Sequence, residues 1–83
     1  MYKIEVIPSA QKDLDNVEKK FFIQIKSRID SLKSNPRPVG CLKLTTEEGY
    51  RLRSGDYRIL YRIDDKNKIV YIYKIKHRKE SYR

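Results

Sequence analysis

The chain has little of what many secreted proteins and metalloproteins depend on. It has one cysteine, Cys41, so no disulfide can form within the chain, and this fits a reducing cytoplasm. One histidine, His77, far from that cysteine in sequence, does not make a metal site. No apolar run approaches the length of a membrane span, and the alternating N-terminus is too short for a signal peptide. We therefore expect a cytoplasmic protein without a metal, a small-molecule cofactor or a membrane partner.

Positive charge is abundant. The chain carries 20 Lys and Arg residues against 11 Asp and Glu, a formal net charge of +9. The excess lies mostly in residues 41–83, which hold 12 basic and 6 acidic side chains. Such charge favours a phosphate polymer or an acidic protein as partner, although a merely solvated surface has the same composition. At 83 residues we expect one domain, residues 1–83, around a small core.

The hydrophobic pattern predicts an α+β fold. A strand at residues 2–7 precedes two antiparallel helices, with apolar stripes over residues 10–17 and 22–32. Ser9 is expected to cap the first helix, and Pro36 lies just beyond the end of the second. Three to four further strands then form an antiparallel sheet, with the helices on one face and the other face partly open. These strands are expected at residues 42–45, 50–53, 57–63 and 69–75.

One stretch, GYRLRSGDYRILYR at residues 49–62, combines arginine and tyrosine at strand spacing. Alternate side chains of a strand share a face, so Arg51 and Arg53 point to one side. If the two strands pair, Arg58 can join them on the open face. A guanidinium group keeps its charge, and its planar donors match phosphate oxygens. An anion site is one interpretation, and a solvated sheet face with arginines over tyrosine rings is the other.

The segment after the last expected strand adds three polar candidates. His77 is the side chain whose charge is expected to change near neutral pH. Arg78 supplies another guanidinium group, and Tyr82 could stack on a base or donate a proton. Because the segment follows the strand directly, it can fold over the end of the sheet.

These motifs resemble the RelE/ParE toxin superfamily. The resemblance is carried by the NP pair that closes the second helix, LKL, GYRLRSGDYRILYRI, the strand rich in Ile, Val and Tyr, and the terminal HRKESYR. It extends over essentially the whole chain. It implies the RelE-like fold of two helices against an antiparallel sheet, and a cognate antitoxin whose acidic or amphipathic segment covers the toxin.

The superfamily includes two activities. RelE-like members cut messenger RNA in the ribosomal A site, whereas ParE-like members bind DNA gyrase and cut no RNA. Carried over by motif, the catalytic residues are Arg51, Arg53, Arg58, Arg78 and Tyr82. Further basic residues expected to contact RNA are Arg62, Lys43, Lys76, Lys79 and Arg83.

The chain departs from RelE where a proton acceptor is needed. RelE has lysines in place of Arg51 and Arg53, and an arginine does not lose its proton to become a base. Toxins of the YoeB type use a glutamate before the second-strand leucine, but Gly40 and Cys41 stand there. His77 is therefore our candidate for the general base.

The expected activity is metal-independent cleavage of RNA by attack of its own 2′-hydroxyl on the adjacent phosphate. The arginines would stabilise the negative charge that grows on phosphorus. The expected partners are the antitoxin, the ribosome and messenger RNA. A gyrase-binding toxin without nuclease activity is the second hypothesis, because arginine in place of lysine weakens the nuclease chemistry. An inactive relative that binds only RNA or its antitoxin is the third.

Overall fold

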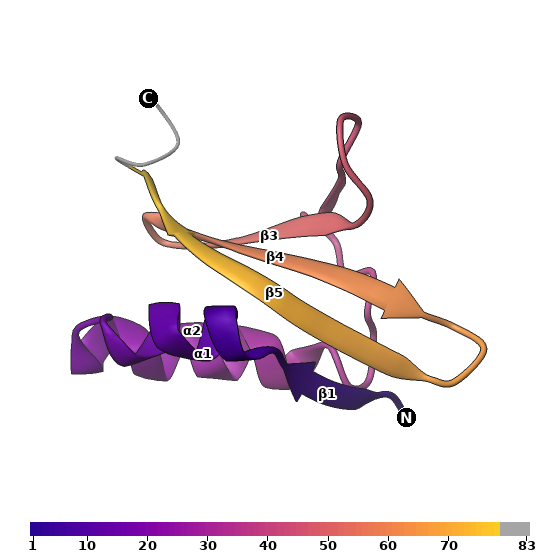
Figure 1. Ribbon diagram of the computed structural model, residues 1–83, viewed down its shortest axis with the longest axis horizontal. Coiled ribbons are helices and arrows are strands. Elements are labelled where there is room, and N and C mark those ends of the chain that lie inside the picture. The colour runs from indigo at the N-terminus through magenta and orange to yellow at the C-terminus, as the bar shows by residue number, and fades with distance from the viewer. Residues whose placement is uncertain (79–83) are drawn as a thin grey trace.

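Two helices cover one face of a β-sheet in the computed structural model, which describes residues 1–78 (Figure 1). The elements along the chain are β1 (Lys3–Val6), α1 (Pro8–Asp15), α2 (Lys19–Ser31), β2 (Leu42–Lys43), β3 (Tyr50–Ser54), β4 (Tyr57–Asp64) and β5 (Ile69–His77). The predicted α+β fold is confirmed. The strand expected at residues 42–45 is shorter than predicted, because it ends at Lys43.

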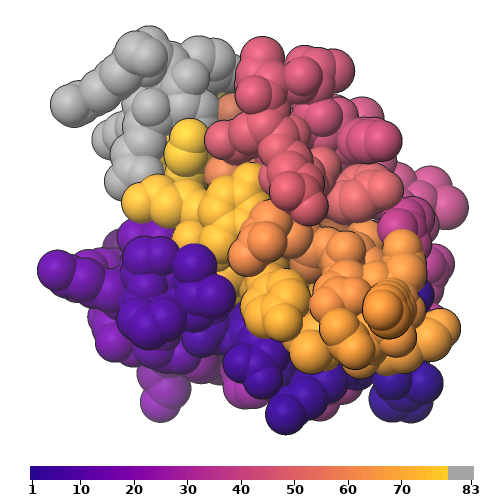
Figure 2. Space-filling model, turned by 45° about the vertical axis from the view of Figure 1, so that its right-hand side comes forward, coloured from indigo at the N-terminus to yellow at the C-terminus, as the bar shows by residue number. Residues whose placement is uncertain are grey.

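The sheet joins the first strand of the chain to the last. Within the described residues the strand order is β1-β5-β4-β3-β2. Strands β2 to β5 are antiparallel neighbours, as predicted, but β1 runs parallel to β5, with Lys3 opposite Ile69 and Val6 opposite Ile72. In the space-filling view the indigo N-terminal residues accordingly lie against the orange and yellow surface of β4 and β5 (Figure 2). The sheet is therefore mixed.

The core lies between the helices and the sheet. The apolar stripes predicted along the helices are buried there, together with inward-facing strand residues. The buried residues of this core are Ala10, Leu14, Ile25, Ile29, Leu32, Leu52, Ile59, Tyr61, Val70, Ile72 and Ile75. Tyr61 is fully buried, and its hydroxyl donates to the Pro36 carbonyl oxygen at 2.8 Å. This bond attaches the segment after α2 to the middle of the sheet.

A β-bulge interrupts β5. Leu60 lies opposite Lys74 and Tyr61 opposite Ile72, so Tyr73 is an extra residue without a partner position on β4. An extra residue shifts the alternation of side chains by one position. The residues of β5 that follow Tyr73 therefore face the side opposite to the one that uninterrupted alternation would give.

Helix α1 covers the edge of β5 beyond the end of β1. The Ser9 hydroxyl donates to the Tyr73 carbonyl oxygen at 3.2 Å, and the Asp13 carboxylate accepts from the Ile75 backbone N–H at 3.0 Å. These side chains form hydrogen bonds with the β5 backbone that a neighbouring strand would otherwise form. The prediction that Ser9 caps the helix is wrong, because Pro8 begins α1 and Ser9 points toward β5.

A polar cluster fastens the segment after α2 to the sheet. Arg37 donates to both carboxylate oxygens of Asp65, at 3.2 and 2.8 Å, and to the Tyr50 hydroxyl at 3.0 Å. The Tyr2 hydroxyl donates to the same carboxylate at 2.6 Å. The hydrogen bonds from Arg37 lower the pKa of the Asp65 carboxyl to about 2. The N-terminus, the segment after α2, β3 and the β4–β5 hairpin thus meet at one charged contact.

Candidate functional site

The sheet face opposite the helices carries a row of cations across three strands. Arg53 of β3 lies opposite Arg58 of β4, and Arg58 lies opposite Lys76 of β5. Residues that are directly opposite share a face, with Cβ atoms about 4.5–5.5 Å apart. Like charges so placed destabilise a sheet. The expected convergence of Arg53 and Arg58 is seen in the structure, and it favours binding of an anion.

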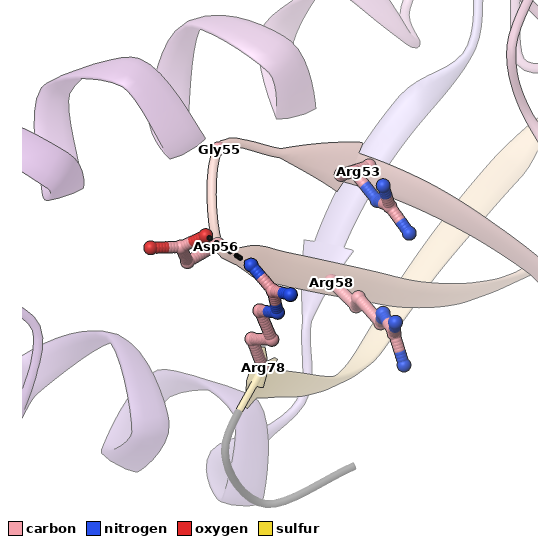
Figure 3. Close-up of a pocket in the computed structure, with 5 residues that line it drawn as sticks. All are labelled: Arg53, Gly55, Asp56, Arg58 and Arg78. Atoms are coloured by element: carbon pink, nitrogen blue, oxygen red, sulfur yellow. Dashed lines mark ion pairs between the residues drawn. The ribbon is translucent and has the colours of Figure 1, made fainter. Parts of the chain in front are cut away.

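Arg53 and Arg58 line a pocket that Arg78 completes (Figure 3). Its volume is about 150 Å³, and its other walls are Gly55 and Asp56 of the β3–β4 turn. This is room for several water molecules or for one phosphate group. Arg53 and Arg58 extend from adjacent strands in the same general direction, and Arg78 reaches toward the turn from beyond β5 (Figure 3). Two neighbouring strands and the residue after β5, which is distant from them in sequence, thus supply three guanidinium groups to one space.

The turn between β3 and β4 fixes the position of Arg78. Gly55 has a φ of +60°, a conformation that glycine adopts freely, and this allows the tight reversal. The carbonyl oxygen of Asp56 accepts a hydrogen bond from the Arg78 backbone N–H at 2.7 Å. The Asp56 carboxylate also lies 3.9 Å from Nη1 of Arg78. Arg78, the residue after β5, is therefore attached to the turn at the edge of the pocket.

Two other predicted arginines, Arg51 and Arg62, share this face but do not line the pocket. Arg51 comes two residues before Arg53 on β3, so it faces the same side one step further along the strand. Arg62 lies toward the far end of β4, with its guanidinium carbon 5.2 Å from the centre of the Tyr71 ring. Three acidic residues share its hollow: Glu48, Asp64 and Asp65. Arg62 is therefore in a region of mixed charge, unlike the pocket arginines.

Two predicted residues lie on the helix side of the sheet. His77 is opposite Tyr57, and their rings meet edge to face with centroids 4.9 Å apart. Because the bulge at Tyr73 shifts the alternation of β5, Lys76 faces the arginines and His77 faces the helices. Lys43, opposite the core-side residue Tyr50, is also on the helix side. The structure therefore does not bring His77, our candidate base, to the arginine pocket.

Three further predicted residues, Lys79, Tyr82 and Arg83, lie outside the described residues. Within residues 1–78, no group of three or more His, Cys, Asp and Glu side chains could hold a metal ion. The same part of the chain contains no helix that is both long enough and apolar enough to cross a membrane.

Two residues that the sequence did not single out support the pocket. Arg28 of α2 donates from Nε and Nη2 to the Arg53 carbonyl oxygen, at 3.2 and 2.9 Å. Asp56 holds Arg78 through the contacts described above. Asp56 could have been found from the sequence, because it is an acidic residue in a short turn between two arginine-bearing strands. No sequence spacing points to Arg28, because its contact depends on how α2 packs against the end of β3.

Comparisons with known proteins agree with this arrangement. The family described as the ParE toxin of the type II toxin–antitoxin system parDE matches residues 4–82. Toxin RelG of Mycobacterium tuberculosis is 30% identical over 84 residues, which cover 99% of this chain and 97% of that protein.

Solved structures show the same fold. The toxin–antitoxin complex RelBE2 of Mycobacterium tuberculosis gives a TM-score of 0.82 at 29% identity, covering 93% of this chain and 98% of that chain. The RelE–RelB complex of Pyrococcus horikoshii gives a TM-score of 0.79 at 29% identity, covering 93% and 94%. The chain therefore belongs to the RelE/ParE superfamily and is a toxin of a type II toxin–antitoxin system.

Proposed function

We propose that this protein is an endoribonuclease that cuts messenger RNA in the ribosomal A site. The observation that carries the proposal is the convergence of Arg53, Arg58 and Arg78 on one pocket of phosphate size. Similarity to toxins of the RelE type supports it. A protein that only bound gyrase would have no need of three guanidinium groups around a space for a single phosphate.

In the proposed reaction the RNA attacks its own backbone. The 2′-hydroxyl oxygen forms a bond to the adjacent phosphorus, and the bond from that phosphorus to the 5′-oxygen breaks. A base takes the 2′ proton, and an acid gives a proton to the departing 5′-oxygen. The products are a 2′,3′-cyclic phosphate and a free 5′-hydroxyl. No metal ion takes part in this scheme.

The pocket arginines stabilise the charge that develops on the phosphoryl oxygens. Donors that are already in place for such charge contribute roughly 2–4 kcal/mol each, by analogy with oxyanion-hole donors. Arginine does not act as the base, because it remains protonated. His77 faces the helices, on the other side of the sheet from the arginine pocket, so this scheme does not use it as the base. Tyr82 remains our candidate for stacking on a base or for protonating the 5′-oxygen.

We also propose a cognate antitoxin as partner. The similar solved structures are RelE–RelB and RelBE2 toxin–antitoxin complexes. The net charge of +9 favours an acidic or amphipathic segment in that partner. Co-expression of this chain with the product of the adjacent small open reading frame tests the pairing. The expected result is a complex that purifies intact and restores growth.

Substitution of pocket arginines tests the nuclease. Induced wild-type protein should arrest growth and produce new messenger RNA 5′ ends inside translated codons. Arg58→Ala and Arg78→Ala should each remove most of these ends, because each deletes one phosphate-binding guanidinium. Lys26→Ala is the control, since it removes an exposed cation from α2, on the other side of the sheet, and it should retain most cleavage.

Thermal melting of the purified variants must show that they remain folded. If folded Arg58→Ala and Arg78→Ala proteins both still cut translated messenger RNA, the pocket is not the active site. If the wild type cuts no RNA but blocks supercoiling by purified gyrase, the gyrase hypothesis replaces this proposal.

A further inference from the structure

Asp56 places a carboxylate at the wall of the arginine pocket (Figure 3). A negative charge there repels an incoming phosphate and so lowers the affinity of the pocket for an anion. A site that only needed to bind phosphate would be better without it. The contacts of Asp56 with Arg78 give this carboxylate a role.

Arg78 depends on the turn more than the other two pocket arginines do. Arg53 and Arg58 are held by the strand pairing of β3 and β4, whereas Arg78 lies beyond the last residue of β5. Its backbone N–H is bonded to the Asp56 carbonyl oxygen at 2.7 Å, which fixes the main chain. Its guanidinium Nη1 lies 3.9 Å from the Asp56 carboxylate, and this contact acts on the side chain itself.

We propose that Asp56 is a positioning residue that holds the Arg78 guanidinium at the turn side of the pocket before RNA binds. A donor that is already in place where negative charge develops needs no reorganisation at the moment of reaction. The effect on cleavage rests on the proposed function, but the contact can be tested without it. The carboxylate then has two opposite effects, weaker binding of the anion and faster reaction once it is bound.

Asp56→Asn separates these effects, because it removes the charge and keeps the backbone carbonyl that Arg78 uses. The matched control is Asp30→Asn, since Asp30 forms an equally long ion pair of 3.9 Å with Lys26 on the exposed surface of α2. The first measurement is nitrogen-15 relaxation of the Arg78 Nε–H group in free protein. Asp56→Asn should increase the mobility of this group, and Asp30→Asn should leave it unchanged. Unchanged mobility in Asp56→Asn overturns the proposal.

The second measurement separates binding from reaction. The binding probe is a single-stranded RNA with a 2′-deoxy nucleotide at the cleavage position, and the rate is that of single-turnover cleavage on programmed ribosomes. Asp56→Asn should lower the Kd of the probe and also lower the cleavage rate, each by about two- to fivefold, the range of an exposed ion pair. In an Arg78→Ala background the same substitution should no longer change the rate.

A purely structural role predicts a different pattern, in which Asp56→Asn weakens binding and slows cleavage together. That pattern, or a rate effect of Asp56→Asn that persists in the Arg78→Ala background, overturns the proposal. If the wild type neither binds the probe nor cuts RNA, the nuclease function fails. The relaxation measurement still decides whether Asp56 positions Arg78.

Discussion

The guanidinium group of Arg28 donates two hydrogen bonds to the backbone carbonyl oxygen of Arg53, with distances of 3.2 Å from Nε and 2.9 Å from Nη2. Arg28 belongs to α2, and Arg53 lies on β3 beyond the two residues that pair with β2, Tyr50 and Arg51. The contact therefore occupies a part of the β3 edge that no strand within residues 1–78 covers. It also connects the helix layer to the arginine pocket on the other side of the sheet.

Arg28→Ala should lower the free energy of unfolding by about 1–2 kcal/mol, because it removes two hydrogen bonds from a charged donor. Urea unfolding followed by circular dichroism measures this change. Lys26→Ala, on the exposed surface of the same helix, is the control and should cost less than about 0.5 kcal/mol. Equal stability of the two variants would show that the contact contributes nothing measurable.

The contribution of Asp65 to stability should depend on pH in the acid range. Hydrogen bonds from Arg37 lower the pKa of the Asp65 carboxyl to about 2, below its ordinary value of about 3.9. A lowered pKa in the folded state stabilises the protein above about pH 4, and this stabilisation is lost as the pH falls toward 2. The Tm of the wild type should exceed that of Asp65→Asn by a constant amount from pH 5 to 8. The difference should shrink between pH 4 and 2, and a constant difference down to pH 2 would contradict this assignment.

The contribution of Tyr61 to stability should depend on pH in the alkaline range. Burial raises the pKa of its hydroxyl above the ordinary value of about 10. In the unfolded chain this hydroxyl ionises near pH 10, whereas in the folded protein it stays neutral, so its contribution to stability falls as the pH rises above 10. Tyr61→Phe should cost about 1 kcal/mol at pH 7 through loss of the bond to Pro36.

Between pH 9 and 11 the Tm of Tyr61→Phe should fall by less than the Tm of the wild type. Tyr71→Phe is the control, since that tyrosine lies on the opposite face of the sheet and is partly exposed. Identical alkaline slopes for the wild type and Tyr61→Phe would mean that the buried hydroxyl ionises as readily as a solvated one.

Among the glycines with a positive φ, Gly49 should tolerate substitution least. Its φ is +121°, and a Cβ atom there would lie 2.4 Å from the Tyr61 carbonyl oxygen. Gly49→Ala must therefore displace the backbone at the start of β3, and it should cost more than about 3 kcal/mol. Gly40 has a φ of +96°, but a Cβ atom there would meet no other atom within 4 Å. Gly40→Ala should therefore cost only the backbone strain. Thermal melting of both proteins tests this order, and equal losses of Tm would refute it.

Much of the fold could be predicted from periodicity alone. The helical stripes that end at Leu32 and the alternation around Arg53 and Arg58 are local patterns, and the short turn at Gly55 leaves few possible registers. The parallel pairing of β1 with β5 could not be predicted, because it joins segments without a short connection. A pattern within one strand does not say which distant strand will lie beside it.

The site was less predictable than the fold, for one physical reason. Val70 and Ile72 face the core by simple alternation, but the bulge at Tyr73 shifts the phase, so that Ile75 and His77 face the core as well. Without the bulge, His77 would lie on the arginine face. The sequence held one sign of this shift: the apolar residue Ile75 follows the core residue Ile72 by an odd number of positions, which simple alternation would place on the other face.

The parallel pairing of β1 and β5 determines when during its synthesis the toxin can assemble. Lys3 and Ile69 are neighbours in the sheet but are separated by 66 positions in the chain. At about 5–20 residues per second, translation delivers β5 roughly 3–13 s after β1. Near the end of that interval the nascent chain contains Arg53 and Arg58, but it still lacks Arg78 and the strand β5 that pairs with β1. Partial products released before residue 69 would therefore be unable to form the anion pocket.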